Sequence, residues 1–160
     1  MIVILQSLIE SLRLELQQYG EMLALLDQQR DVVGLQGTGD ILHSISAIDT
    51  QSGAIQSSRA HRQEVQRQLA EKLRQSSDSS FAQLMPSIPE QYRPLVTALV
   101  QENNELLQRV RQRAQQNHLL LRHSSEMMQR FISNLSQAEQ PELAREDDFS
   151  SMELQPASPH

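Results

Sequence analysis

The side chains best suited to catalysis or metal binding do not form a pattern typical of either. The chain has five histidines, which are His43, His61, His118, His123 and His160. None forms the Glu-x-x-His pair of a bundle di-iron site or a His-Glu-x-x-His run, and the spacing of His118 and His123 turns them to different helix faces. Cysteine is absent, which excludes a thiolate zinc site and a Cys nucleophile. The sequence therefore predicts no enzyme activity, no metal site and no cofactor.

Basic residues gather in two places, and nucleic acid is the first partner to consider. They are Arg59, Arg62, Arg67, Lys72 and Arg74 in one cluster and Arg109, Arg111 and Arg113 in the other. The second group is spaced by two, so its members fan around a helix instead of lining a groove. The net charge is −6 and aromatics make up 3% of the chain, which argues against phosphate binding and base stacking. An acidic segment of the same chain is an alternative partner for these bases.

The longest helical pattern runs from Pro94 to Leu135, which contains no further Pro and no Gly. Apolar or small residues recur there every three or four positions, as on one helical face. They are Val96, Leu99, Asn103, Leu106, Val110, Ala114, Asn117, Leu121, Ser124, Met128, Phe131 and Leu135. A helix over 94–136 would be roughly 60 Å long and needs partner helices along its length.

Two further helices, over residues 2–31 and 40–75, are predicted to supply that partner. The first carries Leu5, Ile9, Leu12, Leu16, Tyr19, Leu23 and Leu26, widened by Leu8, Leu14, Met22 and Leu25. The second carries Ile41, Ile45, Ile48, Ser52 and Ile55, then Val65, Leu69 and Leu73. Its middle, from Ser57 to Arg62, is polar, which predicts either a water-facing stretch or a hinge. The carboxylates of all three helices are interpreted as solvated.

The connections complete the predicted fold. A Gly-rich turn over residues 34–40 makes the first two helices antiparallel, and the bridge over residues 76–93 returns the third against them. Phe81, Leu84, Met85 and Ile88 predict that this bridge packs on the end of the bundle. We expect an all-α fold, either an antiparallel hairpin of long helices or a three-helix bundle with coiled-coil-like packing, forming one domain over residues 1–136.

Residues 137–160 are predicted to form a flexible, disordered acidic tail. Six carboxylates there oppose one arginine, Arg145, and Pro141, Pro156 and Pro159 break helices. Leu143, Phe149, Met152 and Leu154 are spaced apolar residues within it. Such a tail either solvates the protein or folds onto a partner, and the sequence leaves both interpretations open.

The hydropathy of the sequence predicts where in the cell the protein is located. Met1 to Leu5 lacks the basic start and the length of a secretory signal, and no 18-residue apolar window predicts a membrane span. We expect a cytoplasmic protein that does not insert into membranes.

The C-terminal part of the long helix is richer in apolar residues than one face requires. The excess around Leu119 to Leu135 predicts a groove for a partner helix, with Leu120, Met127 and Ile132 offset from the core stripe and Phe131 at its border. These four residues are the predicted partner-binding site.

The three-helix plan, the Leu-Leu-Asp-Gln-Gln-Arg segment from Leu25 to Arg30, and the run Asn117-His118-Leu119-Leu120-Leu121 resemble the FlgN family of flagellar export chaperones. The similarity covers about residues 1–136. It implies a cytosolic chaperone that binds the C-terminal amphipathic helix of hook-associated proteins on its third helix and delivers them to the flagellar type III export gate. Members often carry a Tyr-Gly-type tail element for the gate; here Phe149 is the only aromatic residue of the tail and the candidate for that contact.

Two other classes of function stay open. A structural coiled-coil subunit would self-associate through the same apolar stripe, and a chaperone without its client would form a weak homodimer. A nucleic-acid-associated helical protein is the third class.

Overall fold

Four α-helices make up most of the computed structural model, which describes residues 1–35 and 38–136. They are α1 (Ile2–Leu35), α2 (Thr38–Lys72), the short α3 (Phe81–Leu84) and α4 (Arg93–Ser136). Two 3-10 turns, η1 (Met85–Ser87) and η2 (Glu90–Tyr92), lie between α3 and α4. The described residues contain no strand, so the predicted all-α fold is confirmed for them. The predicted tail lies outside them.

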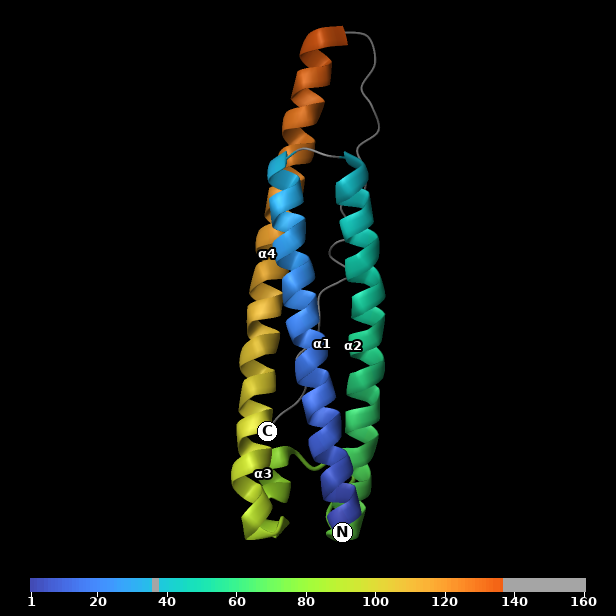
Figure 1. The fold of residues 1–160 in the computed structure, drawn as a ribbon, viewed down its shortest axis with the longest axis vertical. Coiled ribbons are helices and arrows are strands. Elements are labelled where there is room, and N and C mark those ends of the chain that lie inside the picture. Colours follow the sequence, from blue (N-terminus) through green and yellow to red (C-terminus); the bar gives the residue numbers. More distant parts are fainter. Residues whose placement is uncertain (36–37, 137–160) are drawn as a thin grey trace.

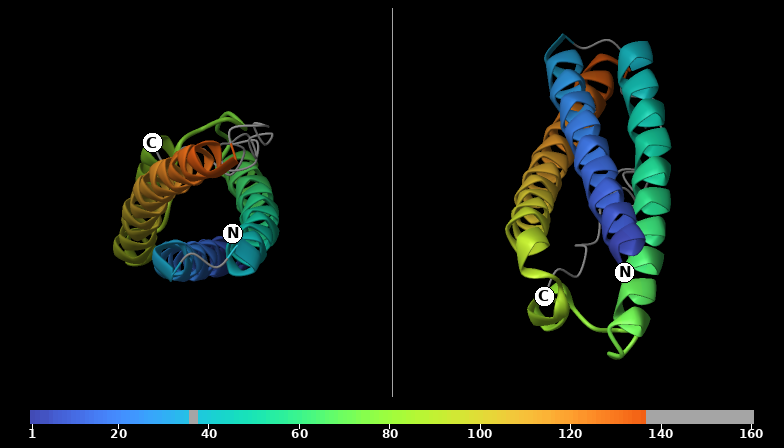
Figure 2. Two further views of the ribbon diagram at one scale, coloured as in Figure 1. Left: turned by 90° about the horizontal axis from the view of Figure 1, so that it is seen from above. Right: turned by 60° about the horizontal axis from the view of Figure 1, so that its bottom comes forward.

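The long helices run up, down and up again (Figure 1). The helix α1 packs closely against both α2 and α4, whereas few close backbone contacts join α2 directly to α4. Seen from above, α2 and α4 lie on different sides of α1 (Figure 2). The result is a three-helix arrangement in which α1 is antiparallel to α2 and parallel to α4.

One apolar cluster fills the end of the bundle that holds the N-terminus. It consists of Leu5, Leu8, Ile9 and Leu12 of α1, Val65 and Leu69 of α2, Phe81 and Ile88 of the bridge, and Val96 and Leu99 of α4. Phe81 is 3% exposed. The prediction that the bridge packs on the bundle end is therefore confirmed.

Ser80 fixes the position of Phe81 by starting α3. Its hydroxyl accepts a hydrogen bond from the Gln83 backbone N–H at 3.3 Å, and its own N–H donates to the Gln83 side chain at 2.9 Å. This reciprocal capping satisfies donors that a helix start leaves open. Arg93 closes the other end of the bridge by donating to the carbonyl oxygens of Ile88 and Pro86, each at 2.8 Å.

A second apolar cluster lies further along the bundle and joins all three long helices. It contains Tyr19, Met22 and Leu26 of α1, Ile48 and Ile55 of α2, and Leu107, Val110 and Ala114 of α4. Two details of the predicted stripes were wrong. Leu107 is buried at 2% exposure while Leu106 is only half-buried, and Leu14 is 43% exposed. Adjacent helical positions differ by about 100°, so neighbouring leucines cannot both point at one core.

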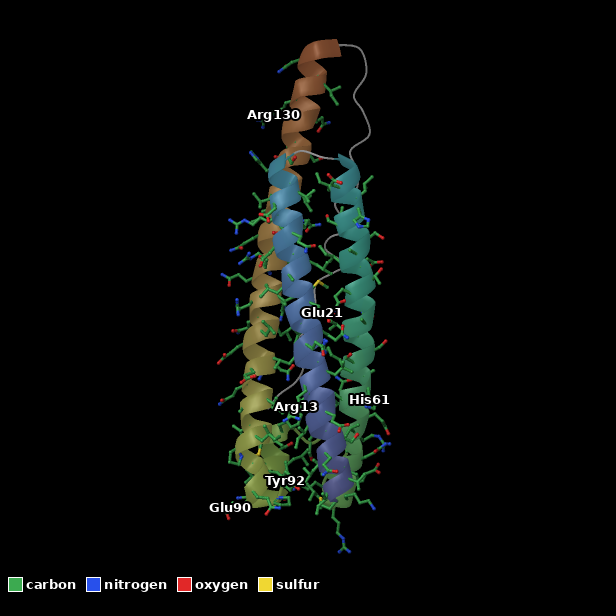
Figure 3. All side chains as sticks on the ribbon, viewed as in Figure 1. Arg13, Glu21, His61, Glu90, Tyr92 and Arg130 are labelled. Carbon is green, nitrogen blue, oxygen red and sulfur yellow. The ribbon has the colours of Figure 1, made fainter. Side chains whose placement is uncertain are left out.

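The polar middle of α2 faces water on one side, where Ser57 and His61 are exposed, and is buried on the other side. Ser58 and Arg62 are buried, and α2 is continuous across them, although His61 points away from the bundle (Figure 3). Arg62 Nε donates to Glu15 Oε2 at 2.9 Å, and both side chains are almost wholly buried. The interpretation of every carboxylate as solvated was therefore wrong at Glu15, where a buried ion pair joins α1 to α2.

Tyr19 and Phe81 surround this ion pair. The Tyr19 hydroxyl donates to Glu15 Oε1 at 2.7 Å, and the guanidinium carbon of Arg62 lies 5.8 Å from the centre of the Phe81 ring. Burial, with the Glu15 charge as the next cause, raises the pKa of Tyr19 above its ordinary value. The phenol therefore stays protonated and keeps donating to Glu15.

Two buried asparagines set the register between α4 and α1. The Nδ2 of Asn103 donates to the carbonyl oxygen of Leu12 at 3.1 Å, and that of Asn117 donates to Leu26 at 2.7 Å. In both hydrogen bonds the two residues are 91 positions apart in the sequence. The two helices therefore keep the same offset at two contacts that lie two heptads apart along α4. A buried polar side chain at a seam position specifies the register of paired helices.

Candidate binding surface at the end of α4

The C-terminal part of α4 extends past the α1–α2 hairpin. Asn117 lies level with Leu26, where it donates to the α1 backbone. From those two positions α1 continues to Leu35 and α4 continues to Ser136, which correspond to roughly 13 Å and 28 Å of helix. Figure 1 shows this last part of α4 in orange, beyond the turn. The prediction that this helix is longer than either of its partner helices is confirmed.

A polar link across all three helices holds α4 just before it projects. Asn117 donates to Gln29 Oε1 at 3.1 Å, and Gln29 Nε2 donates to the Ser44 hydroxyl of α2 at 3.1 Å. Asn117 and Gln29 are both buried. On the outer side, the guanidinium of Arg113 forms an ion pair with Asp27 of α1. The start of the projecting segment is thus fixed in orientation.

The structure exposes one of the four predicted partner-binding residues. Leu120 is 40% exposed, and its neighbour Leu119, which the predicted site omitted, is 63% exposed. Ile132 is half-buried. Met127 and Phe131 belong to α4, but their side chains lie outside the described part of the structure.

Helical phase divides the four predicted residues between two sides of α4. At about 100° per residue, positions 127 and 131 fall within about 20° of Leu120, in line with Arg113 on the side that flanks α1. Ile132 falls about 120° away, in line with Ala114, which packs in the cluster shared with α2. Ile132 therefore lies on a different side of α4 from Leu120.

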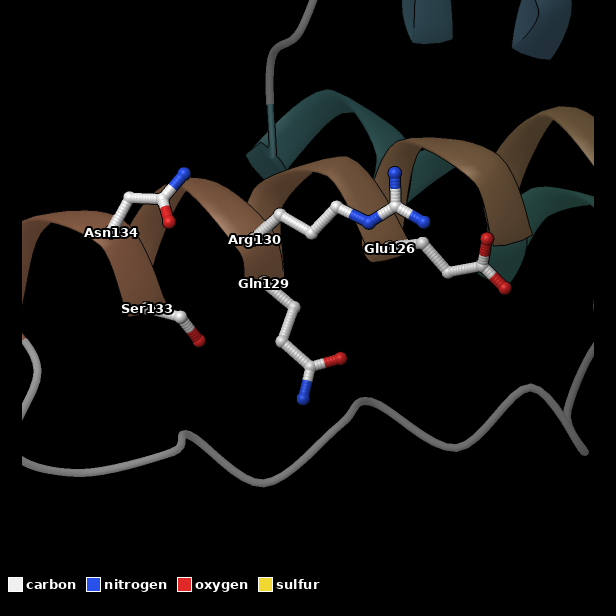
Figure 4. A pocket seen from close by; sticks show the side chains of 5 residues that line it. All are labelled: Glu126, Gln129, Arg130, Ser133 and Asn134. Carbon is white, nitrogen blue, oxygen red and sulfur yellow. The ribbon is translucent and has the colours of Figure 1, made fainter.

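A polar recess lies on the same segment. Its lining residues all come from α4 and are Glu126, Gln129, Arg130, Ser133 and Asn134 (Figure 4). Their helical phases place them away from the core stripe. This recess offers hydrogen-bonding groups and mixed charge, so it suits the polar rim of a partner better than an apolar anchor.

Nothing in the described residues points to chemistry at this surface. Residues 1–35 and 38–136 hold no cluster of three or more His, Asp or Glu placed to bind a metal ion. No helix among them is long and apolar enough to span a membrane. The surface can bury apolar side chains. Leu119 and Leu120 are 63% and 40% exposed, so covering them would gain a corresponding fraction of the about 1.5–3 kcal/mol that burying a fully exposed leucine is worth.

Comparison with known proteins gives one match. A family model described as FlgN protein matches residues 1–148. No curated protein and no solved structure matches this chain. The match covers all of the helices described above, and its members are flagellar export chaperones and not enzymes. The chain therefore belongs to the FlgN family.

Proposed function

We propose that this protein is a cytoplasmic flagellar export chaperone that binds the C-terminal amphipathic helix of hook-associated proteins. It keeps them soluble until they reach the flagellar export gate, and Phe149 contacts that gate. Leu120, Met127, Phe131 and Ile132 are the proposed client-binding residues. The family supports the general role, and the residues of α4 support the mode of binding.

The observation that carries the proposal is the combination of exposed leucines with a helix longer than its partners. Asn117, Gln29 and Ser44 hold α4 in place, and exposed Leu119 and Leu120 follow at once. Amphipathic helices bind by laying apolar residues spaced by three and four into such a surface. A rigid base with an exposed apolar end suits reversible capture of a client helix.

The client segment is tested by copurification with hook-associated proteins of the same organism. The tagged chaperone should retain the full-length client and lose the same client when its C-terminal helix is deleted. A deletion of equal length elsewhere in the client serves as the control. Retention of the client without its C-terminal helix would contradict the proposed binding mode.

Self-association as a structural subunit is the alternative, and exposed residues at the far end of the molecule favour it. Ile2 and Val3 are 53% and 77% exposed at the start of α1. A chaperone should form at most a weak dimer through the end of α4, and adding the client should dissociate it. Light scattering with and without client distinguishes the two: a dimer that persists with bound client, and that Val3→Glu removes, would favour the structural subunit.

A further inference from the structure

One side of α4 meets α2 through side chains and not through close backbone contacts. Leu107 and Ala114 of α4 share an apolar cluster with Ile48 and Ile55 of α2, although few close backbone contacts join the two helices. The stripe on this side of α4 consists of Asn104, Leu107, Arg111, Ala114, His118, Leu121 and Ser125, and all are buried or half-buried. We call this side, with Arg59 of α2, the α2–α4 face.

The α2–α4 face is basic as well as apolar. Arg111 and His118 alternate with Leu107, Ala114 and Leu121 along α4, and no carboxylate occupies a position of the stripe. On α2, Arg59 is half-buried, its Nε is shielded from solvent, and its charge acts on the Tyr19 hydroxyl. An occupant that suits this face carries carboxylates interspersed with apolar side chains.

Residues 137–160 of this chain have that composition. Glu146, Asp147 and Asp148 precede Phe149, and Met152 follows. The segment starts where α4 ends at Ser136. An extended chain rises ~3.3 Å per residue, so residues 146–148 reach back roughly 33–40 Å, whereas Arg111 lies about 38 Å back along α4 at ~1.5 Å per residue. The acidic run can therefore reach Arg111 and His118.

We propose that the acidic run at residues 146–148, together with Phe149, docks on the α2–α4 face of the same molecule. Its carboxylates lie against Arg111, and Phe149 lies beside them on the half-buried part of the face, because Leu107 and Ala114 are already covered in the cluster shared with α2. The docked tail covers Phe149 in the free protein. This proposal concerns the free chain and does not depend on which client the protein binds.

Paramagnetic relaxation in the full chain tests the docking directly. The protein has no native cysteine, so Ser151→Cys carries a single spin label. Amide signals of residues 107–118 should broaden at 50 mM salt, with intensities reduced at least twofold, and recover at 1 M salt, where the Debye length falls to about 3 Å. Broadening confined to residues 126–136, or unchanged by salt, would overturn the proposal.

Matched variants distinguish pairing of the acidic run with Arg111 from a general attraction of the tail to basic residues. Arg111→Gln should at least halve the broadening, whereas Arg109→Gln, which removes the same charge from an exposed position two residues away, should not. The changes Glu146→Gln, Asp147→Asn and Asp148→Asn neutralise the tail without altering the helices, and they should abolish the broadening of residues 107–118. Equal effects of the two arginine changes would contradict docking at this face, as would broadening that survives the neutralised tail.

A mixture of spin-labelled and isotope-labelled chains identifies the molecule that supplies the tail. Docking within one chain predicts little broadening when the label and the observed amides are on different chains. Broadening as strong in the mixture as in the single labelled chain would assign the face to the tail of a second copy and overturn the proposal.

Discussion

The Glu15 carboxylate binds two side chains in the interior of the bundle. Arg62 of α2 donates from Nε to Oε2 at 2.9 Å and from Nη2 to Oε1 at 3.4 Å, and the Tyr19 hydroxyl also donates to Oε1. Arg62 also reaches the Phe81 ring and Gln66 Oε1, and Gln66 in turn donates to the Ser79 carbonyl of the bridge. These contacts couple α1, α2 and the bridge through one pair of charges. Removing either charge leaves the other buried without its partner.

Glu15→Gln should therefore lower the free energy of unfolding by about 3–5 kcal/mol, the usual cost of leaving a buried charge without its partner. The double change Glu15→Met with Arg62→Met should recover most of that loss, because it removes both charges. Urea denaturation measures both. Arg67→Ala is the control, since its ion pairs with Glu64 and Glu71 are exposed, and its urea midpoint should hardly change. A double variant less stable than Glu15→Gln would contradict this account.

Tyr19 makes the free energy of unfolding depend on pH in the alkaline range. Its pKa is raised above the ordinary value of 10.0, first by burial and then by Glu15. The folded protein keeps a proton that the unfolded chain releases near pH 10, so this contribution is complete below about pH 10 and declines above it. Tyr19→Phe should make the loss of stability between pH 9 and 11.5 less steep. Equal slopes for the two proteins in urea titrations would exclude this linkage.

At the scale of the helices, the spacing of apolar residues was sufficient to predict the main elements. The ranges 2–31, 40–75 and 94–136 correspond to α1, α2 and α4, with ends that differ by at most four residues. The spacing could not find the Glu15–Arg62 pair, because the two residues are far apart in sequence and each resembles a solvated charge. It also could not choose between Leu106 and Leu107, since both fit a three-four pattern.

Part of the candidate surface was also predictable, namely its place on the helix. The length of α4 and its extra leucines indicated a projecting apolar end, and Leu120 is exposed there. The side of the helix on which Ile132 falls was not predictable, because it depends on where α1 and α2 pack. The Arg113–Asp27 pair and the Asn117 hydrogen bond define that orientation.

The asparagine register leads to a prediction for the pairing of α1 and α4. In both Asn103 and Asn117 the Oδ1 atom is buried and has no hydrogen-bond partner in the described structure. Replacing both by Leu, together with Gln29→Leu so that the buried Gln29 Oε1 is not left without the Asn117 donor, removes this cost and should raise the urea midpoint, because the carbonyl groups of Leu12 and Leu26 keep their helical hydrogen bonds. The same change should increase self-association in size-exclusion chromatography, since one register is no longer specified. A lower midpoint would show that the asparagines stabilise the fold.

At the scale of the whole molecule, the described bundle has its own core and fixed ends. The bridge closes the end near Phe81, and the polar link at Gln29 joins the helices near the α1–α2 turn. Within residues 1–35 and 38–136, only the end of α4 extends beyond this frame. The proposed capture of a client at the end of α4 would therefore depend on a different part of the chain from folding.

Deleting residues 137–160 tests that separation. Because both core clusters lie within the three long helices and the bridge, helicity and melting temperature should stay nearly unchanged, while export of the client falls. Circular dichroism and a secretion assay measure the two effects. A truncated protein that melts well below the full chain would show that the tail belongs to the core.

The most direct test of the central claim is a calorimetric titration of two matched variants with a peptide of the client's C-terminal helix. Leu120→Glu and Leu14→Glu change the same residue type at 40% and 43% exposure, one at the proposed site and one on α1. Placing a carboxylate against the apolar side chains of the client should raise Kd roughly 10- to 100-fold for Leu120→Glu, with Leu14→Glu near wild type and both proteins equally stable. Wild-type affinity for Leu120→Glu, or an equal loss in both variants, would contradict client binding at the end of α4.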